Sequence, residues 1–189
     1  MSIQEIDEEE AYLELNNINK PIEEIKSYVI KCVILGDSSV GKTSLVNYYL
    51  TNQMKNTETT LGAIFWLIDK QMDNGDLIKL NVWDTAGQER YNSLIPMYTR
   101  NSDIVILTFS LTDRVSFNNL VKWKETTKYC TNLENLKFII IGNKCDLENY
   151  ICITDKDIKN MIKKHFDKDT PYFKTSALNG DNINETFKE

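Results

Sequence analysis

The sequence predicts an α/β protein with three layers: a mostly parallel, six-stranded sheet with one antiparallel edge strand and helices on both faces. Apolar runs of strand length alternate along the chain with segments that have helical spacing. Several runs are continuously apolar, as expected for parallel strands that are buried on both faces. Two other runs flank DNGD (73–76), a sequence typical of a hairpin turn, and this hairpin accounts for the antiparallel strand.

The elements are assigned in order from composition and spacing. SYVIKCVILG (27–36) is rich in apolar and β-branched residues and stops at a glycine, and the next segment places Leu45, Val46 and Tyr49 on one side of a helix. The rest of the chain continues the alternation. We therefore expect strands at 27–36, 61–72, 76–84, 103–111, 137–143 and 171–176, and helices at 41–53, 113–129, 154–166 and from 181 onward.

The length and the charge distribution predict one main domain with an acidic leader. The chain has 189 residues, and its net charge of -6 lies in residues 1–26, while residues 27–189 are balanced. This balance argues against a nucleic-acid-binding domain, which needs a basic excess on one face. We expect an acidic N-terminal extension at 1–26, either a solvated tail or a docked helix, and one folded domain at 27–189.

No segment predicts a membrane span or a targeting signal. The longest apolar runs reach about nine residues, well below the 18 or more that cross a bilayer. Ser2 stands where N-myristoylation needs a glycine, and the N-terminus lacks the basic start of a secretory signal. The four cysteines form no CxxC pair and His165 is the only histidine, so we expect free thiols and a cytoplasmic protein rather than a zinc site.

The strongest motif follows the first predicted strand. GDSSVGKT (36–43) matches GxxxxGK[ST], and it lies between a strand and a helix, as a phosphate-binding loop requires. The glycines let backbone N–H groups turn toward a phosphate, Lys42 reaches the terminal phosphates, and the Thr43 hydroxyl can ligate Mg²⁺. The motif alone does not separate ATPases, kinases and GTPases.

Three loops after later strands narrow this choice. Asp84 ends a hydrophobic strand and is expected in the Mg²⁺ shell, and Gly87 lets its backbone N–H approach the γ-phosphate. Asp146 in NKCD can accept two hydrogen bonds from guanine, whereas adenine offers no such paired donors. Ala177 in TSAL can donate its N–H to the guanine oxygen. Together the loops predict a guanine nucleotide site at the carboxyl ends of the strands.

These motifs resemble those of the Ras superfamily of small GTPases, and specifically of the Rab family. GDSSVGKTSLV, TLGAIF, WDTAGQERY, SLIPMY, DRVSF, GNKCDL and TSAL stand where Rab motifs stand, from about residue 28 to the end. LGAIF and AGQERYNSLIPMY look most like the early-endosomal Rab branch. The resemblance implies the P-loop NTPase fold of a small GTPase (G) domain, and a GTP-binding and GTP-hydrolysing switch that regulates vesicle trafficking.

The motifs and the resemblance together assign roles to the site residues. Gln88 is expected to orient the attacking water, and Lys42 is expected to stabilise the charge that develops on the phosphates. Mg²⁺ would be held by Thr43, by Thr60, which also senses the γ-phosphate, and through water by Asp84. The residues expected to bind GTP or GDP are Ser38, Ser39, Val40, Gly41, Lys42, Thr43, Ser44, Thr60, Gly87, Asn143, Lys144, Asp146, Ser176, Ala177 and Leu178.

The resemblance also implies protein partners. Phe65, Trp83 and Tyr98 would form the aromatic triad on which effectors dock, although strand aromatics also arise from plain core packing. An exchange factor would accompany the GTPase cycle. All three arginines lie outside the phosphate loop and the segment that leads to Thr60, so an activating protein must supply the arginine that accelerates hydrolysis by roughly 10³ to 10⁵.

Some features depart from the Rab pattern. Thr60 follows Lys42 by 18 positions, one fewer than expected, and residues 51–59 contain no aromatic side chain to cover the guanine, so Met54 is expected to take that place. The last helix stops at Glu189 without the C-terminal cysteines of a Rab. We therefore expect membrane association only through a lipidated tail that is absent from this chain.

Two other functions fit parts of the pattern. A P-loop kinase would need an arginine-bearing lid or an acceptor pocket, which three scattered arginines do not supply. A weakly hydrolysing GTP-binding interaction module of a longer protein is compatible with the shortened segment before Thr60, and it stays as the alternative.

Overall fold

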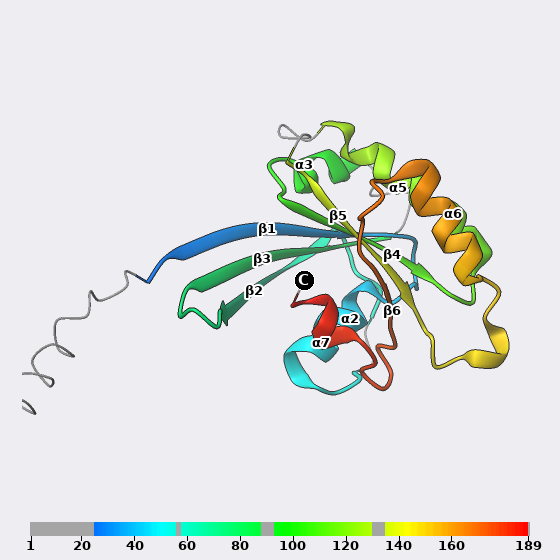
Figure 1. The fold of residues 1–189 in the computed structure, drawn as a ribbon, viewed down its shortest axis with the longest axis horizontal. Helices are drawn as coiled ribbons and strands as arrows, with labels where there is room; N and C mark the ends of the chain where they lie inside the picture. The colour runs from blue at the N-terminus through cyan, green and yellow to red at the C-terminus, as the bar shows by residue number, and fades with distance from the viewer. Residues whose placement is uncertain (1–24, 56–57, 88–92, 130–134, 189) are drawn as a thin grey trace, which may run out of the picture.

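The computed structural model describes residues 25–55, 58–87, 93–129 and 135–188, and these residues form a six-stranded sheet with helices on both faces (Figure 1). The strand order is β2-β3-β1-β4-β5-β6, and β2 is the antiparallel edge strand. The predicted fold class is therefore confirmed. The strands are β1 (Ser27–Leu35), β2 (Ala63–Gln71), β3 (Leu77–Thr85), β4 (Ile104–Ser110), β5 (Lys137–Asn143) and β6 (Tyr172–Lys174).

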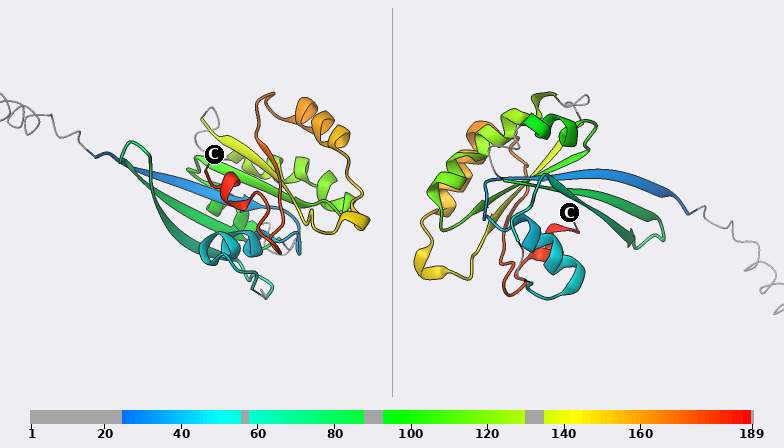
Figure 2. Two further views of the ribbon diagram at one scale, coloured as in Figure 1. Left: turned by 60° about the horizontal axis from the view of Figure 1, so that its bottom comes forward. Right: turned by 180° about the vertical axis from the view of Figure 1, so that it is seen from behind.

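The helices form two layers that enclose the sheet. α3, α5 and α6 lie on one side of the sheet and α2 and α7 on the other (Figures 1 and 2). None of the helices among the described residues is long and apolar enough to span a membrane. The helices are α2 (Lys42–Thr51), α3 (Ile95–Thr99), α4 (Arg114–Asn118), α5 (Leu120–Thr126), α6 (Asp155–His165) and α7 (Ile183–Thr186), with 3-10 turns at Thr127–Tyr129 and Glu148–Tyr150.

The alternation of side chains along β1 explains why both faces of the sheet are covered. Val33 and Leu35 are buried in the core cluster beneath α3, α5 and α6, whereas Cys32 and Ile34 are buried in the cluster beneath α2 and α7. Successive side chains of a strand point to opposite faces, so a continuously apolar strand needs a layer on each side. Its buried carboxyl end places the phosphate loop at a fixed position.

Two helical segments differ from the prediction. The expected helix at 113–129 is divided into α4, α5 and a 3-10 turn, because Asn119 adopts a ψ of -9° between α4 and α5. The short helix α3 was not predicted from the sequence. Five residues are too few to display a helical period, so spacing alone could not have found α3.

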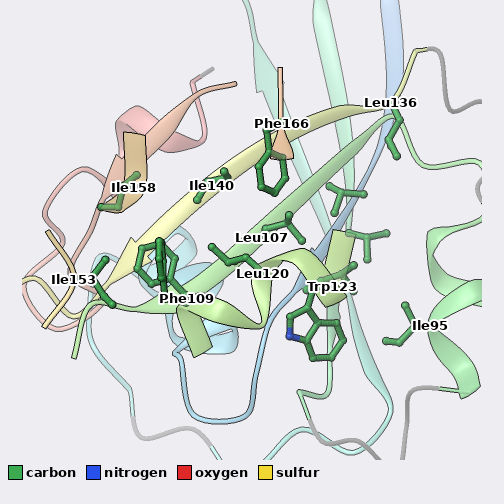
Figure 3. Packing of buried hydrophobic residues seen from close by; sticks show 14 of the residues in the cluster. Ile95, Leu107, Phe109, Leu120, Trp123, Leu136, Ile140, Ile153, Ile158 and Phe166 are labelled. Carbon is green, nitrogen blue, oxygen red and sulfur yellow. The ribbon is translucent and has the colours of Figure 1, made fainter. Parts of the chain in front are cut away.

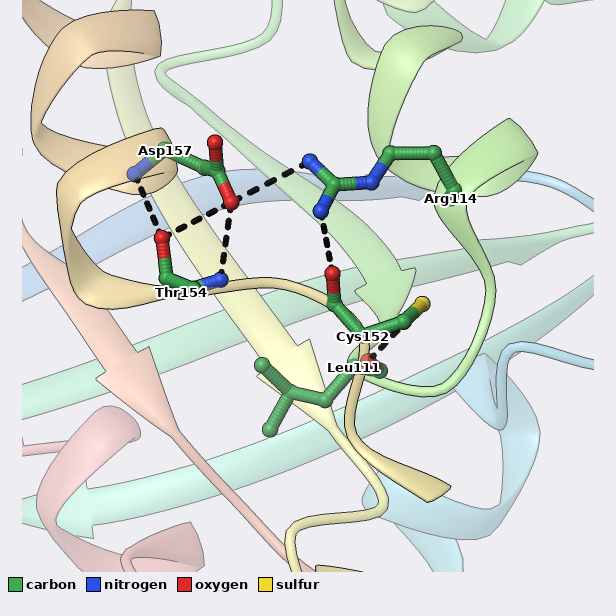
Figure 4. Close-up of polar contacts among 5 residues, drawn as sticks. All are labelled: Leu111, Arg114, Cys152, Thr154 and Asp157. Atoms are coloured by element: carbon green, nitrogen blue, oxygen red, sulfur yellow. Dashed lines mark hydrogen bonds and ion pairs between the residues drawn. The ribbon is translucent and has the colours of Figure 1, made fainter.

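The N-terminus of α6 is held by a small polar network (Figure 4). Thr154 and Asp157 form a reciprocal capping box, with Asp157 N–H donating to Thr154 Oγ1 at 3.2 Å and Thr154 N–H donating to Asp157 Oδ2 at 2.9 Å. Arg114 of α4 pairs with Asp157 Oδ2 at 3.2 Å and also donates to the Cys152 carbonyl. These bonds to Thr154 and Arg114 hold the pKa of the Asp157 carboxyl below its ordinary value.

We expect Thr154→Ala to lower the free energy of unfolding by about 1 kcal/mol, because it leaves N–H groups at the start of α6 without their cap. Chemical denaturation of the purified protein measures this change. Thr154→Ser keeps the hydroxyl and is the matched control, which should retain most of the stability. Equal stability of the alanine variant and the unaltered protein would contradict the capping role.

Candidate functional site

The predicted site residues gather at the carboxyl ends of neighbouring parallel strands. The phosphate loop (residues 36–43) follows β1, and the loop with Gly87 follows β3. The segments 143–146 and 175–178 follow β5 and β6. This edge of a parallel sheet is where α/β proteins bind ligands. The phosphate loop contributes to both of the hollows described below.

Gly41 shows why the phosphate loop needs glycine before α2. Gly41 precedes the first residue of the helix and has a φ of 100°, in the left-handed region that favours glycine. A Cβ atom at this position would lie 2.2 Å from Asn143 Nδ2. The close approach lets Asn143 Nδ2 donate to the Val40 carbonyl at 2.8 Å. The start of α2 is thereby fixed against the loop that follows β5, and its N–H groups favour an anion.

The Lys42 side chain is almost completely buried beneath the phosphate loop. Its Nζ donates to the carbonyls of Gly36 and Asp37, both at 2.8 Å. Burial lowers the pKa of Lys42 to about 8, against the opposing attraction of Asp84 and Asp37. A buried ammonium group has lost much of its hydration, so a nearby anion stabilises its charged form strongly. A nucleotide phosphate is such an anion.

Three oxygen-bearing side chains meet beside Lys42. Thr43 Oγ1 donates to Asp84 Oδ2 at 2.6 Å and lies 2.9 Å from Thr60 Oγ1. Thr43 comes from α2, Asp84 from β3 and Thr60 from the segment before β2, so the fold brings together residues that are far apart in sequence. All of these donors are oxygens, which Mg²⁺ prefers.

Asp84 is the strongest indication that a cation fits here. Its side chain is buried, and burial raises its pKa to about 6, although the bond from Thr43 and the charge of Lys42 lower it. Its Oδ1 atom has no hydrogen-bond partner among the described residues. A buried carboxylate oxygen without a partner is costly, and a metal-bound water would satisfy it. The residues present therefore fit the expected Mg²⁺.

Gly87 closes the phosphate hollow on the side of β3. A Cβ atom at Gly87 would lie 2.4 Å from the Asp37 carbonyl and 2.5 Å from Lys42 Nζ, so only a glycine fits. The hollow is lined by Ser38, Ser39, Gly41, Lys42, Thr43, Ser44, Glu58, Thr59, Thr60, Thr85 and Gly87. Gln88, the residue expected to orient water, lies outside the described residues.

A second hollow continues from the phosphate loop toward the loops after β5 and β6. Met54 is among the lining residues, and its predicted contact with the guanine stays a prediction. Lys144 has a φ of 67°, an uncommon conformation that often marks functional positions. The lining residues are Ser39, Gly41, Ser44, Met54, Asn143, Lys144, Asp146, Leu147, Ala177 and Leu178.

Ser176 orients the carboxylate that is expected to read the base. Ser176 Oγ donates to Asp146 Oδ1 at 2.5 Å and accepts the Leu178 N–H at 3.2 Å. The Ala177 N–H donates to Asn143 Oδ1 at 3.1 Å. If the Ala177 N–H binds the guanine oxygen as predicted, it must either leave Asn143 Oδ1 or donate to both oxygens at once.

The predicted aromatic triad is contiguous. The ring centroids of Phe65 and Trp83 are 5.2 Å apart, and those of Trp83 and Tyr98 are 5.7 Å apart. Phe65 is half exposed, whereas Tyr98 is buried. The row therefore has one end in the core and the other at the surface.

Two polar residues near the site were not predicted from the sequence. Thr85 Oγ1 donates to the Ile34 carbonyl at 2.7 Å and ties β3 to β1 beneath the loops. Asp37 accepts hydrogen bonds from Asn119 and Trp123, which lie more than 80 positions away. No local sequence signal could have revealed the Asp37 contacts, because they depend on the packing of α5 beside the phosphate loop.

Comparison with known proteins agrees with this geometry. Residues 31–189 match the model of the Ras family. The chain is 39% identical over 168 residues to the Ras-related protein Rab-9A of Rattus norvegicus and 38% identical over 168 residues to Rab-9B of Homo sapiens, in each case covering 87% of this chain and 82% of the relative. It is 37% identical over 166 residues to Rab7 of Pisum sativum, covering 85% of this chain and 79% of the relative. The similarity to the early-endosomal branch stays a prediction.

Proposed function

The chain belongs to the Ras family and, within it, to the Rab-type GTPases, and on this premise we propose that it is a GTP-controlled switch in vesicle trafficking. The observation that carries the proposal is one hollow lined by Lys42, Thr43 and Thr60, with the buried Asp84 carboxylate bonded to Thr43 behind it. This hollow continues into the one that contains Asp146. The first hollow suits phosphates and the second suits a base.

The phosphate loop would bind the nucleotide through its backbone. N–H groups at the start of α2 would donate to the phosphate oxygens, and Lys42 would place its charge beside the terminal phosphates. Two of the three Lys42 donors already bind backbone carbonyls, which fixes the direction of the remaining donor. Asp146 would accept two hydrogen bonds from guanine while Ser176 holds the other side of its carboxylate.

Hydrolysis would proceed by in-line attack of water on the γ-phosphate. Gln88 would orient the water, the bond between the γ-phosphorus and the oxygen that bridges it to the β-phosphate would break, and GDP would be the leaving group. Lys42 would stabilise the negative charge that develops on the phosphate oxygens. Thr43 and Thr60, with Asp84 through water, would hold Mg²⁺, which when bound neutralises part of the phosphate charge. The protons of the attacking water would leave with the inorganic phosphate product.

The proposal requires an activating protein for rapid turnover. Arg114 is engaged with Asp157 and Cys152 at the start of α6, on a different loop from the phosphate hollow. Arg100 follows α3, and Arg90 lies outside the described residues. An arginine supplied by a partner is the usual solution in this chemistry. An exchange factor would then restart the cycle by releasing GDP.

The nucleotide state would be read through Thr60 and Gly87. Both line the hollow where the γ-phosphate would lie, so loss of that phosphate would release the segments that contain them. The aromatic row of Phe65, Trp83 and Tyr98 starts in β2, close to Thr60, and effectors would dock on its exposed end.

We expect Gln88→Leu to slow single-turnover GTP hydrolysis by about 10²-fold, because the attacking water loses its orientation. GTP binding should be nearly unchanged, since the residues that line the phosphate hollow stay in place. Rapid-quench measurement of phosphate release, with binding measured in parallel, separates the two effects. Hydrolysis at the unaltered rate would show that Gln88 does not have the proposed role.

A further inference from the structure

The Asp37 side chain connects the phosphate loop to α5. Its Oδ1 atom accepts the Trp123 indole N–H at 2.6 Å, and its Oδ2 atom accepts the Asn119 side-chain amide at 2.7 Å. Hydrogen bonds to an ionised carboxylate are short and about twice as strong as bonds between neutral groups. Both carboxylate oxygens are therefore held from the same side.

The two donors belong to a rigid part of the molecule. Asn119 lies at the start of α5 and Trp123 is one turn further along, with the Trp123 backbone N–H donating to the Asn119 carbonyl at 3.0 Å. The Trp123 ring is 7% exposed and packs at the margin of the core cluster that includes Leu120 and Ile95 (Figure 3). The indole N–H thus extends from a packed anchor toward the phosphate loop.

The main chain of Asp37 is at the same time part of the phosphate site. Its carbonyl accepts one of the two hydrogen bonds that Lys42 Nζ gives to backbone carbonyls. Gly87 lies against the same peptide, since a Cβ atom there would come within 2.4 Å of the Asp37 carbonyl carbon and oxygen. A shift of this peptide would change both the direction of the lysine and the fit of Gly87.

We propose that Asp37, Asn119 and Trp123 form a clamp that positions the Lys42 ammonium group for the nucleotide phosphates, so that α5 controls how long the nucleotide stays bound. This inference rests on the proposed function. Asp37 is a positioning residue in this account: its carboxylate faces α5, and it acts on the phosphates through its carbonyl and Lys42. Asn119 and Trp123 act on the nucleotide only indirectly, because they hold the Asp37 carboxylate in place.

The test compares dissociation of a fluorescent GDP analogue, with Mg²⁺ and excess GDP, among variants of the whole chain. Asp37→Asn changes one atom and replaces an acceptor with a donor that opposes Asn119 or Trp123. Trp123→Phe keeps an aromatic ring without its N–H. We expect each variant to release the analogue about tenfold faster than the unaltered protein, because a bond to a charged group is lost.

The double variant distinguishes a clamp from two separate effects. If Asp37 and Trp123 act as one unit, the variant with both changes should dissociate no faster than the more affected single variant. Asp113→Asn is the matched control, because Asp113 lines the same surface hollow as Asp37 but its carboxylate accepts the Val115 N–H of α4. This control should retain the dissociation rate of the unaltered protein.

A spectroscopic measurement tests the contact itself. The indole N–H resonance of Trp123, assigned by its loss in Trp123→Phe, should shift upfield in Asp37→Asn, whereas it should keep its position in Asp113→Asn. If Trp123→Phe does not fold, Asp37→Asn alone still tests the dissociation rate.

Unchanged GDP dissociation in a folded Asp37→Asn variant would overturn the clamp, and so would fully additive effects of the two changes. A lower melting temperature with an unchanged dissociation rate would mean that the contact serves stability only. The proposed function has a separate control. If the unaltered protein bound no guanine nucleotide, the proposed function itself would fail, and the role of Asp37 in nucleotide retention would fail with it.

Discussion

Replacing Asp146 with asparagine is expected to weaken GTP binding by about 10²- to 10⁴-fold, because two hydrogen bonds to a charged group are lost. The Asp146→Asn variant should at the same time bind xanthosine triphosphate more tightly than the unaltered protein does. Ser176 donates to Asp146 Oδ1, so the oxygen of an asparagine would keep this place and its amide group would face the base. An amide donor complements the 2-oxo group of xanthine.

Competition binding with GTP, XTP and ATP measures this change in base preference. Asp181→Asn is the matched control, because Asp181 is a nearby carboxylate outside the residues that line the base hollow. It should leave the preference for GTP intact. Adding Ser176→Ala to Asp146→Asn should reduce the gain for XTP, since the amide then loses its fixed orientation. An Asp146→Asn variant that still prefers GTP would contradict the assignment of the base hollow.

Thr43→Asn is expected to have the second large effect. The Thr43 hydroxyl bonds to Asp84 and lies beside Thr60, so its removal disrupts the oxygen cluster in which Mg²⁺ would be held. Loss of a residue that supports a metal ligand typically lowers metal affinity by about 10- to 100-fold. We expect the Mg²⁺-dependent affinity for GTP to fall by at least this factor. GDP binding should suffer less, because the contact of Thr60 with the γ-phosphate is absent in that state.

Titration of the fluorescent analogues of GTP and GDP at several Mg²⁺ concentrations measures both affinities. Thr43→Ser retains the hydroxyl and should behave like the unaltered protein. If Thr43→Asn kept the same dependence of GTP affinity on Mg²⁺, the cation would have to be held elsewhere, and the proposed role of the cluster of Thr43, Thr60 and Asp84 would be wrong.

The sheet could be predicted from the sequence because its signal is local. β5 begins and ends at the predicted residues, and β1 and β3 end within one residue of their predicted ends. The carboxyl halves of β1 and β5 are buried and mostly apolar, because a helical layer covers each face of the sheet there. The positions of Lys42, Asp84 and Asp146 followed from the same reasoning, since each lies in a loop or at a strand end on one edge of the sheet.

The contacts between loops could not be predicted in this way. The break at Asn119 and the bonds of Asp37 to Asn119 and Trp123 depend on how α5 packs against the phosphate loop, and this packing has no period in the sequence. The bond between Ala177 and Asn143 likewise joins two strand ends that only the folded sheet brings together. Motifs identified the residue types, whereas the fold determined their partners.

Single-turnover hydrolysis of GTP by the purified chain, with ATP in parallel, tests whether this protein is a guanine-specific GTPase. We expect slow cleavage of GTP, on the order of 10⁻⁴ s⁻¹ as in Ras without its activating protein, and acceleration by about 10³- to 10⁵-fold with a Rab-type activating protein that supplies an arginine. ATP should be neither bound nor cleaved. If GTP stayed intact with the activating protein present, or if ATP were cleaved equally well, the protein would not be a guanine-specific GTPase.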